Sequence, residues 1–172
     1  RQLSTDTIHN AFRNFEGTIE QRPPIYSALK HEGVPLYKLA RKGKPVQKAA
    51  RRVVISSIRI LEINLPEVCF EVSCSAGTYI RTLAADIGES LGYGAHLKSL
   101  RRTESSGLTI KEAITLPELA SLVLSGGISY RMISMADALK GMPAHIADNT
   151  LRRKIKYGNR ISQKDMMPVK PE

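Results

Sequence analysis

Some residue types are scarce in this chain, and each scarcity excludes a class of site. There is no tryptophan and aromatic residues make up 5% of the sequence, which argues against a surface that stacks many bases. The two cysteines, Cys69 and Cys74, lie on opposite faces of one expected strand. We therefore expect no disulfide between them and a cytoplasmic location. The four histidines and the two cysteines show no zinc-ligand spacing, so no zinc site is expected.

Long apolar runs are also missing. No run approaches the roughly 20 residues of a membrane span, and the first residues lack a signal-peptide pattern, so no membrane partner is expected. The 172 residues suffice for one good core and part of a second domain. The chain opens on Arg1 directly into an expected helix and ends abruptly, so we expect an upstream part to be missing.

Carboxylates are absent between Glu32 and Glu62. The chain as a whole holds 26 Lys and Arg against 16 Asp and Glu, a net charge of +10, which is typical of a protein that binds nucleic acid. A solvated basic face is the alternative, although such faces usually intersperse acids. The basic residues of the acid-free interval are Lys38, Arg41, Lys42, Lys44, Lys48, Arg51, Arg52 and Arg59, and further clusters are Arg101–Arg102 and residues 152–160.

The chain is organised around a strand that runs through Gly77 into a helix. Alternation of Val68, Phe70 and Val72 with polar residues predicts the strand. Thr78 is the expected N-cap of the helix that follows. Its apolar face comprises Ile80, Leu83, Ala84, Ile87 and Leu91, and Gly92 ends it.

This junction places Tyr79 and Arg81 near a helix N-terminus. The positive end of the helix dipole does not attract a positively charged guanidinium. Arg81 is therefore expected to face a carboxylate or phosphate from another segment or a ligand. A local pair with Asp86 is the structural alternative, although a spacing of five residues suits it poorly.

The remaining segments predict an α+β fold with a mixed, mainly antiparallel sheet and packed helices. A helix begins at Ser4 or Thr5, and residues 18–34 are expected to form an ordered extended loop because Pro23-Pro24 oppose helix and regular strand. A short helix follows Pro35. Strands are expected over 52–63, where changes in the parity of the β-branched residues indicate a bulge or the bending of two strands, and over 96–103. A hairpin turn is expected at 65–67, and capped helices are expected after Thr115, Ser134 and Asp148. The domain boundary is placed between residues 141 and 142.

Three further side chains are candidates for contact with a ligand, and each also has an ordinary structural explanation. Tyr26 and Lys30 lie in the proline-containing loop, and each of them, taken alone, is explained as an ordinary loop residue. Leu100 is either a core leucine or the wall of a pocket beside Arg101 and Arg102.

Several motifs in the same order resemble the TruB family of tRNA pseudouridine synthases over residues 5–120. The proline-containing motif is similar to that of the bacterial tRNA enzymes rather than to relatives that use guide RNA. The motifs are Phe15 to Gln21, Pro23 to Lys30, Leu36 to Gly43, Cys74 to Leu83, Asp86 to Gly88, Gly94 to His96 and Leu100 to Arg102.

The resemblance implies roles for individual residues. Arg81 matches the arginine that pairs with the catalytic aspartate, Tyr79 the tyrosine that packs on the flipped uridine, and Leu100 a leucine of the same pocket. Ala76 departs from relatives that carry lysine there. The family's Gly-x-Leu-Asp motif, which holds the aspartate, does not occur in these residues, so the chain is expected to lack its nucleophile and to be inactive alone.

The implied reaction is isomerisation of the uridine at position 55 in the T loop of tRNA, without metal or organic cofactor, on a base flipped into a pocket. The implied fold is a partial pseudouridine synthase core over residues 1–141, followed by the start of a small PUA-like β domain over 142–172. The T arm of tRNA is the expected partner, contacted by Lys38, Arg41, Lys42, Arg101 and Arg102, with no obligate protein partner. The alternatives are a non-catalytic tRNA-binding or RNA-folding module and a guide-RNA-dependent synthase subunit.

Overall fold

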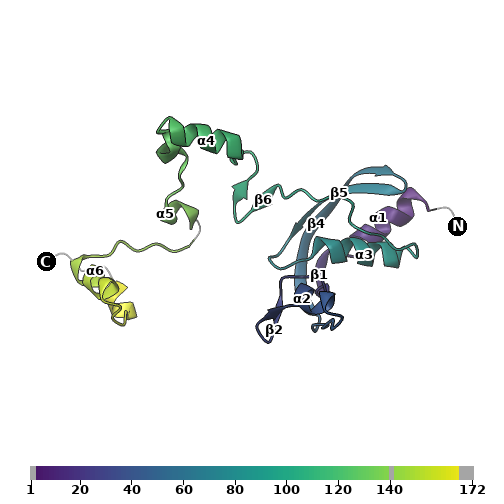
Figure 1. The fold of residues 1–172 in the computed structure, drawn as a ribbon, viewed down its shortest axis with the longest axis horizontal. Helices are drawn as coiled ribbons and strands as arrows, with labels where there is room; N and C mark the ends of the chain where they lie inside the picture. The colour runs from purple at the N-terminus through teal and green to yellow at the C-terminus, as the bar shows by residue number, and fades with distance from the viewer. Residues whose placement is uncertain (1–2, 140–141, 167–172) are drawn as a thin grey trace. The chain divides into compact units, whose positions relative to one another are not determined.

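The computed structural model describes residues 3–139 and 142–166, which divide into two compact units, one ending at Arg102 and one beginning at Thr103 (Figure 1). All strand pairs are antiparallel, so the expected α+β class is confirmed. The first unit contains α1 (Thr5–Arg13), β1 (Gly17–Gln21), β2 (Lys30–His31), β3 (Val34–Pro35), α2 (Leu36–Arg41), β4 (Arg51–Asn64), β5 (Glu67–Cys74) and α3 (Ile80–Ser90). The second contains β6 (Glu104–Ser105), β7 (Leu108–Thr109), α4 (Leu116–Leu124), the 3₁₀ helix η1 (Gly127–Arg131), α5 (Met135–Ala138), α6 (Asn149–Lys156) and the 3₁₀ helix η2 (Gln163–Met166).

Strand β4 is the centre of a three-stranded sheet of order β1-β4-β5. Its register against β5 shifts twice, between Ile55 and Ser57 and again between Ile60 and Glu62. A bulge adds one residue and reverses the alternation of side chains, so both even-numbered and odd-numbered isoleucines reach the same core. The core-facing residues of β4 are Ile55, Ile58, Ile60 and Ile63. The changes of parity predicted a bulge or bending, and the structure confirms the bulge and adds a second one.

The first bulge has its own support from outside the strand. The side chain of Glu16 accepts a hydrogen bond from the backbone N–H of Ile58, with Oε1 2.8 Å from the nitrogen. This bond satisfies a backbone donor near the irregular part of the ladder, where a pairing partner is displaced. Glu16 therefore joins the end of α1 to the bulge that sets the side-chain alternation of β4.

Helices α1 and α3 supply the other side of this core. Ile8 and Phe12 of α1 and Leu83 and Ile87 of α3 are buried in one cluster with Ile55. The ring of Phe12 meets the ring of Phe70 edge-on, with centroids 5.0 Å apart, an arrangement that aromatic quadrupoles favour. Helix α1 begins where expected, because the Ser4 hydroxyl accepts from the N–H of Thr7 at 3.2 Å.

Residues 18–34 differ from the expected loop. Their first part belongs to β1, which pairs with β4 from Gly17↔Ile55 to Gln21↔Arg51. A partner strand more than 30 residues away in sequence supplies the hydrogen bonds that the local pattern did not reveal. After the prolines, β2 and β3 pair as a small hairpin and α2 follows directly, with Pro35 as its N-cap.

The expected strand over residues 96–103 is not formed, and this prediction was wrong. The structure has no regular element between α3 and β6. Instead, the loop folds back on α3, and the carbonyl oxygen of Gly88 accepts from the N–H groups of Tyr93 and Gly94 at 3.2 and 2.9 Å. Gly88 is buried, and an added Cβ would lie 2.3 Å from both the backbone nitrogen and the Cβ of Ala95. The loop therefore requires glycine at this point of the helix.

The second unit has a small core, and Leu151 is its buried residue among those described. Its three helices begin at the expected caps. Thr115 and Glu118 form a capping box on α4, Ser134 caps α5, and Asp148 caps α6 by accepting from the N–H of Leu151 at 2.7 Å.

The expected domain boundary between residues 141 and 142 includes Gly141, which lies outside the described residues, and it stays a prediction. No helix within the described ranges combines the length and the apolar character needed to cross a membrane. Cys69 and Cys74 are free, exposed thiols.

We predict that Gly88→Ala destabilises the first unit by about 1–3 kcal/mol, the usual cost of forcing an extra methyl group into a packed site. The backbone of Ala95 must move to admit the methyl group. Urea unfolding followed by circular dichroism measures the change, and Glu89→Ala, at an exposed site on the same helix, serves as the control. An unchanged unfolding midpoint for Gly88→Ala would contradict this prediction, because it would show that the loop moves to admit the methyl group without loss of stability.

Candidate functional site

The junction between β5 and α3 brings the principal candidate residues together. Tyr79 is the N-cap of α3 and has an extended backbone, φ −98° and ψ 104°, without a side-chain cap bond of its own. Helix α3 thus begins at Ile80, and the expectation that Thr78 caps it was wrong. The Thr78 hydroxyl instead donates to the carbonyl oxygen of Ser75 at 2.8 Å, closing the turn around Gly77.

Gln21 holds the backbone of Tyr79 from the end of β1. Its carboxamide oxygen accepts from the N–H of Tyr79 at 2.7 Å, and its nitrogen donates to the carbonyl of Tyr79 at 3.1 Å. Gln21 is 1% exposed. In the sequence, Gln21 belongs to one of the motifs but has no assigned role. Its hydrogen bonds go to a residue 58 positions away, and a local pattern does not reveal such a contact.

Arg51 lies on the other side of the same turn. Its Nη2 donates to the carbonyl oxygen of Gly77, and its guanidinium carbon lies 5.1 Å from the centroid of the Tyr79 ring. Gly77 has φ +85°, and a Cβ there would lie 3.3 Å from the Arg51 guanidinium. Glycine at position 77 therefore permits both the left-handed backbone of the turn and the close approach of the Arg51 guanidinium.

Arg81 projects from the first turn of α3 and is exposed. Its Nη2 donates to the backbone carbonyl of Tyr26 at 2.6 Å, which joins two candidate residues 55 positions apart. The structural alternative, a pair with Asp86, is not formed in the described part of the chain. Burial raises the pKa of Asp86, and the nearby Glu89 carboxylate raises it further. Because a guanidinium carries five N–H donors, Arg81 retains donors for an incoming carboxylate or phosphate.

Tyr26 and Lys30 lie in the segment between β1 and α2. The Tyr26 side chain is 53% exposed, and Lys30 is an exposed residue of β2. The Tyr26 contact with Arg81 runs through its backbone carbonyl, so its ring remains available to a ligand.

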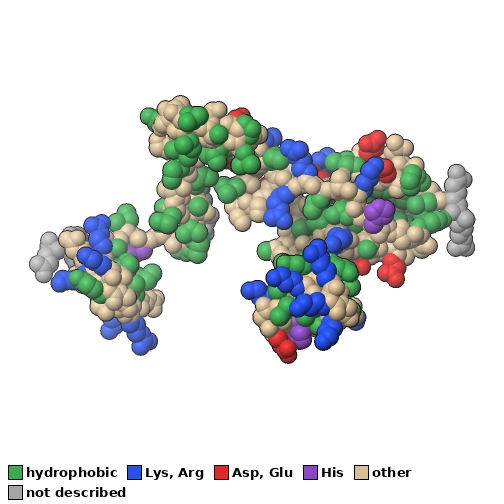
Figure 2. Space-filling model, in the orientation of Figure 1, with side chains coloured by type: hydrophobic (Ala, Val, Ile, Leu, Met, Phe, Trp, Pro, Cys, Tyr) green, Lys and Arg blue, Asp and Glu red, His purple; other side chains and the backbone are tan. Residues whose placement is uncertain are grey.

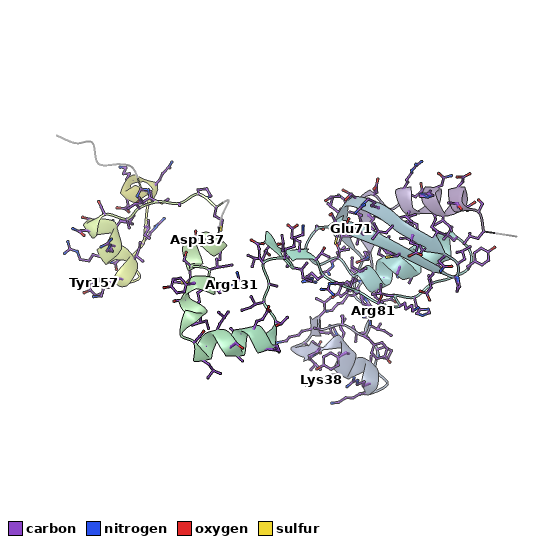
Figure 3. The ribbon with its side chains drawn as sticks, turned by 90° about the horizontal axis from the view of Figure 1, so that it is seen from above. Lys38, Glu71, Arg81, Arg131, Asp137 and Tyr157 are labelled. Carbon is purple, nitrogen blue, oxygen red and sulfur yellow. The ribbon has the colours of Figure 1, made fainter. Side chains whose placement is uncertain are left out.

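Basic side chains gather over α2 and the β2–β3 hairpin (Figure 2). Lys38 and Arg41 belong to α2, and Lys42 is its C-cap; all three are exposed. The Arg41 guanidinium carbon lies 5.6 Å from the ring centroid of Tyr37. Figure 3 shows Lys38 on α2 and Arg81 on α3 within the same unit.

Part of the basic run already has partners within the protein. Arg51 bonds to Gly77, Arg59 pairs with Glu71 at 2.8 Å, and the Lys48 Nζ lies 3.1 Å from Nδ1 of His31. These side chains are therefore less available to phosphates than Lys38, Arg41 and Lys42. We restrict the name basic surface to the latter three residues.

Leu100, Arg101 and Arg102 lie in the loop that follows α3. Leu100 is 61% exposed, so the interpretation of Leu100 as a core leucine is wrong. The described contacts do not join these three side chains to Tyr79 or Arg81. Their roles in a pocket and in RNA binding stay predictions.

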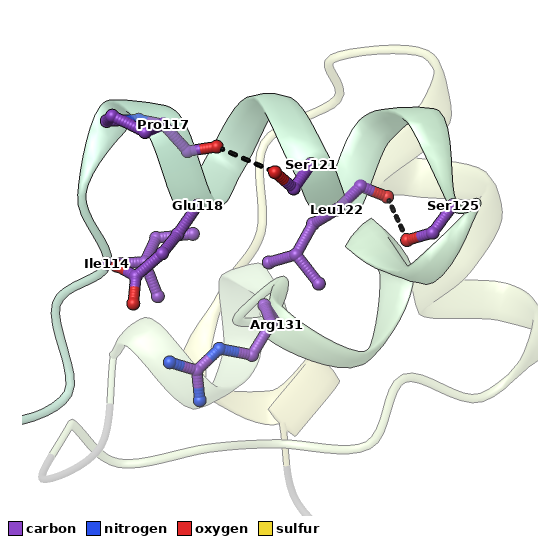
Figure 4. Close-up of a pocket in the computed structure, with 7 residues that line it drawn as sticks. All are labelled: Ile114, Pro117, Glu118, Ser121, Leu122, Ser125 and Arg131. Atoms are coloured by element: carbon purple, nitrogen blue, oxygen red, sulfur yellow. Dashed lines mark hydrogen bonds between the residues drawn. The ribbon is translucent and has the colours of Figure 1, made fainter.

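A depression of about 590 Å³ lies in the second unit along α4 (Figure 4). Its one carboxylate, Glu118, accepts from the N–H and the hydroxyl of Thr115, and these bonds lower the Glu118 pKa, with Arg131 adding to the effect. A carboxylate held as a helix cap is a poor candidate for proton transfer. Within the described residues no three His, Cys, Asp or Glu side chains are grouped to hold a metal ion.

Helix α6 adds a further basic segment in the second unit. Arg152, Arg153 and Lys156 are exposed on it. Lys154 instead pairs with Asp165 of η2 at 2.6 Å. The hydrogen bond from Lys154 and those from Ser162 lower the pKa of Asp165 to about 2, so the carboxylate stays charged well into the acidic range.

Two family models match the chain in sequence. Residues 1–80 match the N-terminal domain of the TruB family of pseudouridylate synthases, and residues 81–156 match the C-terminal domain of tRNA pseudouridylate synthase B. Both matches meet within the Tyr79–Arg81 junction.

Curated relatives agree with these models. A tRNA pseudouridine synthase B from Geobacter sulfurreducens is 45% identical over 139 residues, which cover 81% of this chain and 46% of the relative. The protein of that name from Cupriavidus metallidurans is 44% identical over 165 residues, which cover 94% of this chain and 52% of the relative. The chain thus spans about half the length of the curated relatives it matches.

Two solved structures share the fold. A crystal structure of a Cbf5-Nop10-Gar1 complex has a TM-score of 0.59 at 32% identity, covering 80% of this chain and 36% of the solved chain. An H/ACA RNP bound to a substrate RNA containing 2′-deoxyuridine has a TM-score of 0.54 at 29% identity, covering 80% of this chain and 35% of the solved chain.

Proposed function

The chain belongs to the TruB family of pseudouridine synthases, and on this premise we propose that it takes part in converting uridine to pseudouridine at position 55 in the T loop of tRNA. The observation that carries the proposal is the junction at the start of α3. There Tyr79 and Arg81 lie two residues apart, and Arg81 is joined to the segment of Tyr26. The names of the curated relatives support tRNA as the substrate.

The reaction sets the requirements of the site. The N1–C1′ glycosidic bond of uridine breaks, the uracil turns, and a C5–C1′ bond forms. The proton on C5 leaves to water and N1 takes up a proton, so the product is an isomer of uridine. In the proposal Tyr79 packs on the extruded base, Leu100 lines the same pocket, and Arg81 orients the catalytic carboxylate. We assign that carboxylate to a Gly-x-Leu-Asp motif outside residues 1–172, because none of the aspartates in this chain matches it.

Binding of the RNA rests on charge and shape. Uracil is uncharged, so packing and a few hydrogen bonds hold it, whereas phosphates supply most of the affinity of a folded RNA. The basic surface of Lys38, Arg41 and Lys42 suits phosphate contact because all three side chains are exposed. Arg101 and Arg102 are proposed to add contacts from the loop after α3.

A guide-RNA-dependent subunit is the second candidate. The likeness to Cbf5, solved in complex with Nop10 and Gar1, favours it. The relatives at 44–45% identity carry the name of the tRNA enzyme, whereas the solved structures are 29–32% identical. We therefore propose a stand-alone tRNA enzyme without an obligate protein partner.

We predict that the full reading frame encoding this chain releases tritium from [5-³H]uridine at position 55 of a T-arm RNA, without added protein or guide RNA. Displacement of the C5 proton is the chemical signature of the reaction. An RNA with cytidine at position 55 and labelled uridines elsewhere is the control. Binding of the T-arm RNA without release would favour the RNA-binding module. Release that requires added protein and guide RNA would favour the guide-RNA subunit.

We predict that Arg81→Ala in the same full-length protein lowers turnover by about 10²-fold or more, the usual cost of removing one charged partner from a reacting group. Affinity for tRNA should stay within a few-fold, because Arg81 is proposed to face the carboxylate and not the phosphates. Single-turnover tritium release and filter binding measure the two quantities. Arg13→Ala, at an exposed site on α1, is the control. Equal losses of turnover and affinity would contradict the pairing role.

We predict that Lys38→Ala reduces the salt dependence of tRNA binding. Each phosphate contact contributes about 0.7–0.9 to the slope of log affinity against log salt concentration, so the slope should fall by about that amount. Arg59→Ala removes the same charge from the same unit, but Arg59 is already paired with Glu71, and its slope should not change. The same change of slope in both variants would indicate a net-charge effect and no phosphate contact at Lys38.

A further inference from the structure

Gln21 is one of two buried polar side chains among the described residues, the other being Ser27. Its carboxamide makes two hydrogen bonds, and both go to the backbone of one residue, Tyr79. The Tyr79 carbonyl also accepts from the N–H of Leu83 at 3.0 Å, the first hydrogen bond of α3. Gln21 therefore fixes the residue at which the extended backbone becomes helical.

Gln21 of β1 and Arg51 of β4 lie opposite each other on neighbouring strands. They are direct register partners at the end of the β1–β4 ladder, so their side chains leave the sheet on the same side. Gln21 binds the main chain of Tyr79, while Arg51 covers the Tyr79 ring and bonds to the carbonyl of Gly77. One cross-strand pair thus holds Tyr79 by its backbone and its ring.

The carboxamide also contributes to stability. Removing it leaves the N–H and the carbonyl of Tyr79 without these partners, which costs free energy wherever the two groups stay buried. Tyr79 itself is half-buried, and Gly77 and Arg81, two residues to either side of it, are exposed. The carboxamide does fix direction, because two bonds to one residue define the orientation of the peptide planes on both sides of it.

We propose that Gln21, with Arg51 as its cross-strand partner, is a positioning residue that sets the Tyr79 ring for the flipped uridine. This inference rests on the proposed function, in which Tyr79 packs on the base. Misplacing a substrate-orienting group by about 1 Å can cost about 10²-fold in rate. Gln21 thereby acts on catalysis through Tyr79, without contact with the RNA.

The test compares Gln21→Leu with the wild type in the full-length protein. Leucine has a similar volume, carries no charge that would disturb Arg51, and removes both hydrogen bonds to Tyr79. We expect single-turnover tritium release to slow by about 10- to 100-fold while the tRNA dissociation constant stays within about twofold. Gln47→Leu, the same change at an exposed position of the same unit, is the matched control and should leave both values unchanged.

A double-mutant cycle separates positioning from a general loss of structure. If Gln21 acts through the Tyr79 ring, Gln21→Leu should slow a Tyr79→Ala variant by less than about twofold, because coupled residues are not additive. Additive losses, a full rate in Gln21→Leu, or a fall in tRNA affinity that matches the fall in rate would each overturn the proposal.

Amide hydrogen exchange measured by NMR gives a readout that does not depend on activity. Gln21→Leu should lose protection at the Tyr79 N–H while the N–H groups of Leu83 and Ile87 in α3 keep theirs. Unchanged protection at Tyr79, or loss spread through α3, would contradict the positioning role. A wild type that releases no tritium would refute the proposed function, and the exchange result would still decide whether Gln21 holds Tyr79.

Discussion

The first unit depends on one constraint, the need to turn the isoleucines of a long strand toward a single core. A regular strand of 14 residues alternates its side chains without interruption, and β4 would then send Ile58 and Ile60 to the face opposite Ile55. Two bulges remove this conflict. The resulting apolar face receives α1 and α3, and hydrophobic burial against that face fixes where both helices lie.

The candidate site follows from that packing. Leu83 and Ile87 anchor α3 in the core, so the N-terminus of α3 is placed beside the end of the sheet where β1 finishes and β4 begins. Gln21 and Arg51 occupy these two strand ends and hold the turn that leads into the helix. A rigid sheet thus positions side chains that belong to a loop and to a helix terminus, which is the usual way a scaffold supports a functional site.

The basic residues divide by role. Arg51 and Arg59 form contacts inside the first unit, whereas Lys38, Arg41 and Lys42 remain exposed on and beside α2. Net charge alone therefore overstates the number of side chains that are free to contact phosphates. The proposed site for an uncharged base and the proposed surface for a polyanion can lie in one unit, since the first relies on fixed geometry and the second on charge.

The sequence by itself determined the features whose causes are local. The caps at Ser4, Thr115, Ser134 and Asp148, the alternation in β5 and the changes of parity in β4 each depend on neighbours a few residues away, and the structure confirms them. Several motifs in the same order over residues 5–120, taken together, were sufficient to indicate the family.

Tertiary structure decided the rest. Strand β1 needed β4 as a hydrogen-bonding partner, and residues 96–103 stayed irregular although their pattern favoured a strand, because pairing and not alternation supplies the bonds of a sheet. The bonds from Gln21 to Tyr79 and from Arg81 to Tyr26 join positions 58 and 55 residues apart. No local pattern encodes such contacts, since they exist only once the sheet and α3 have packed together.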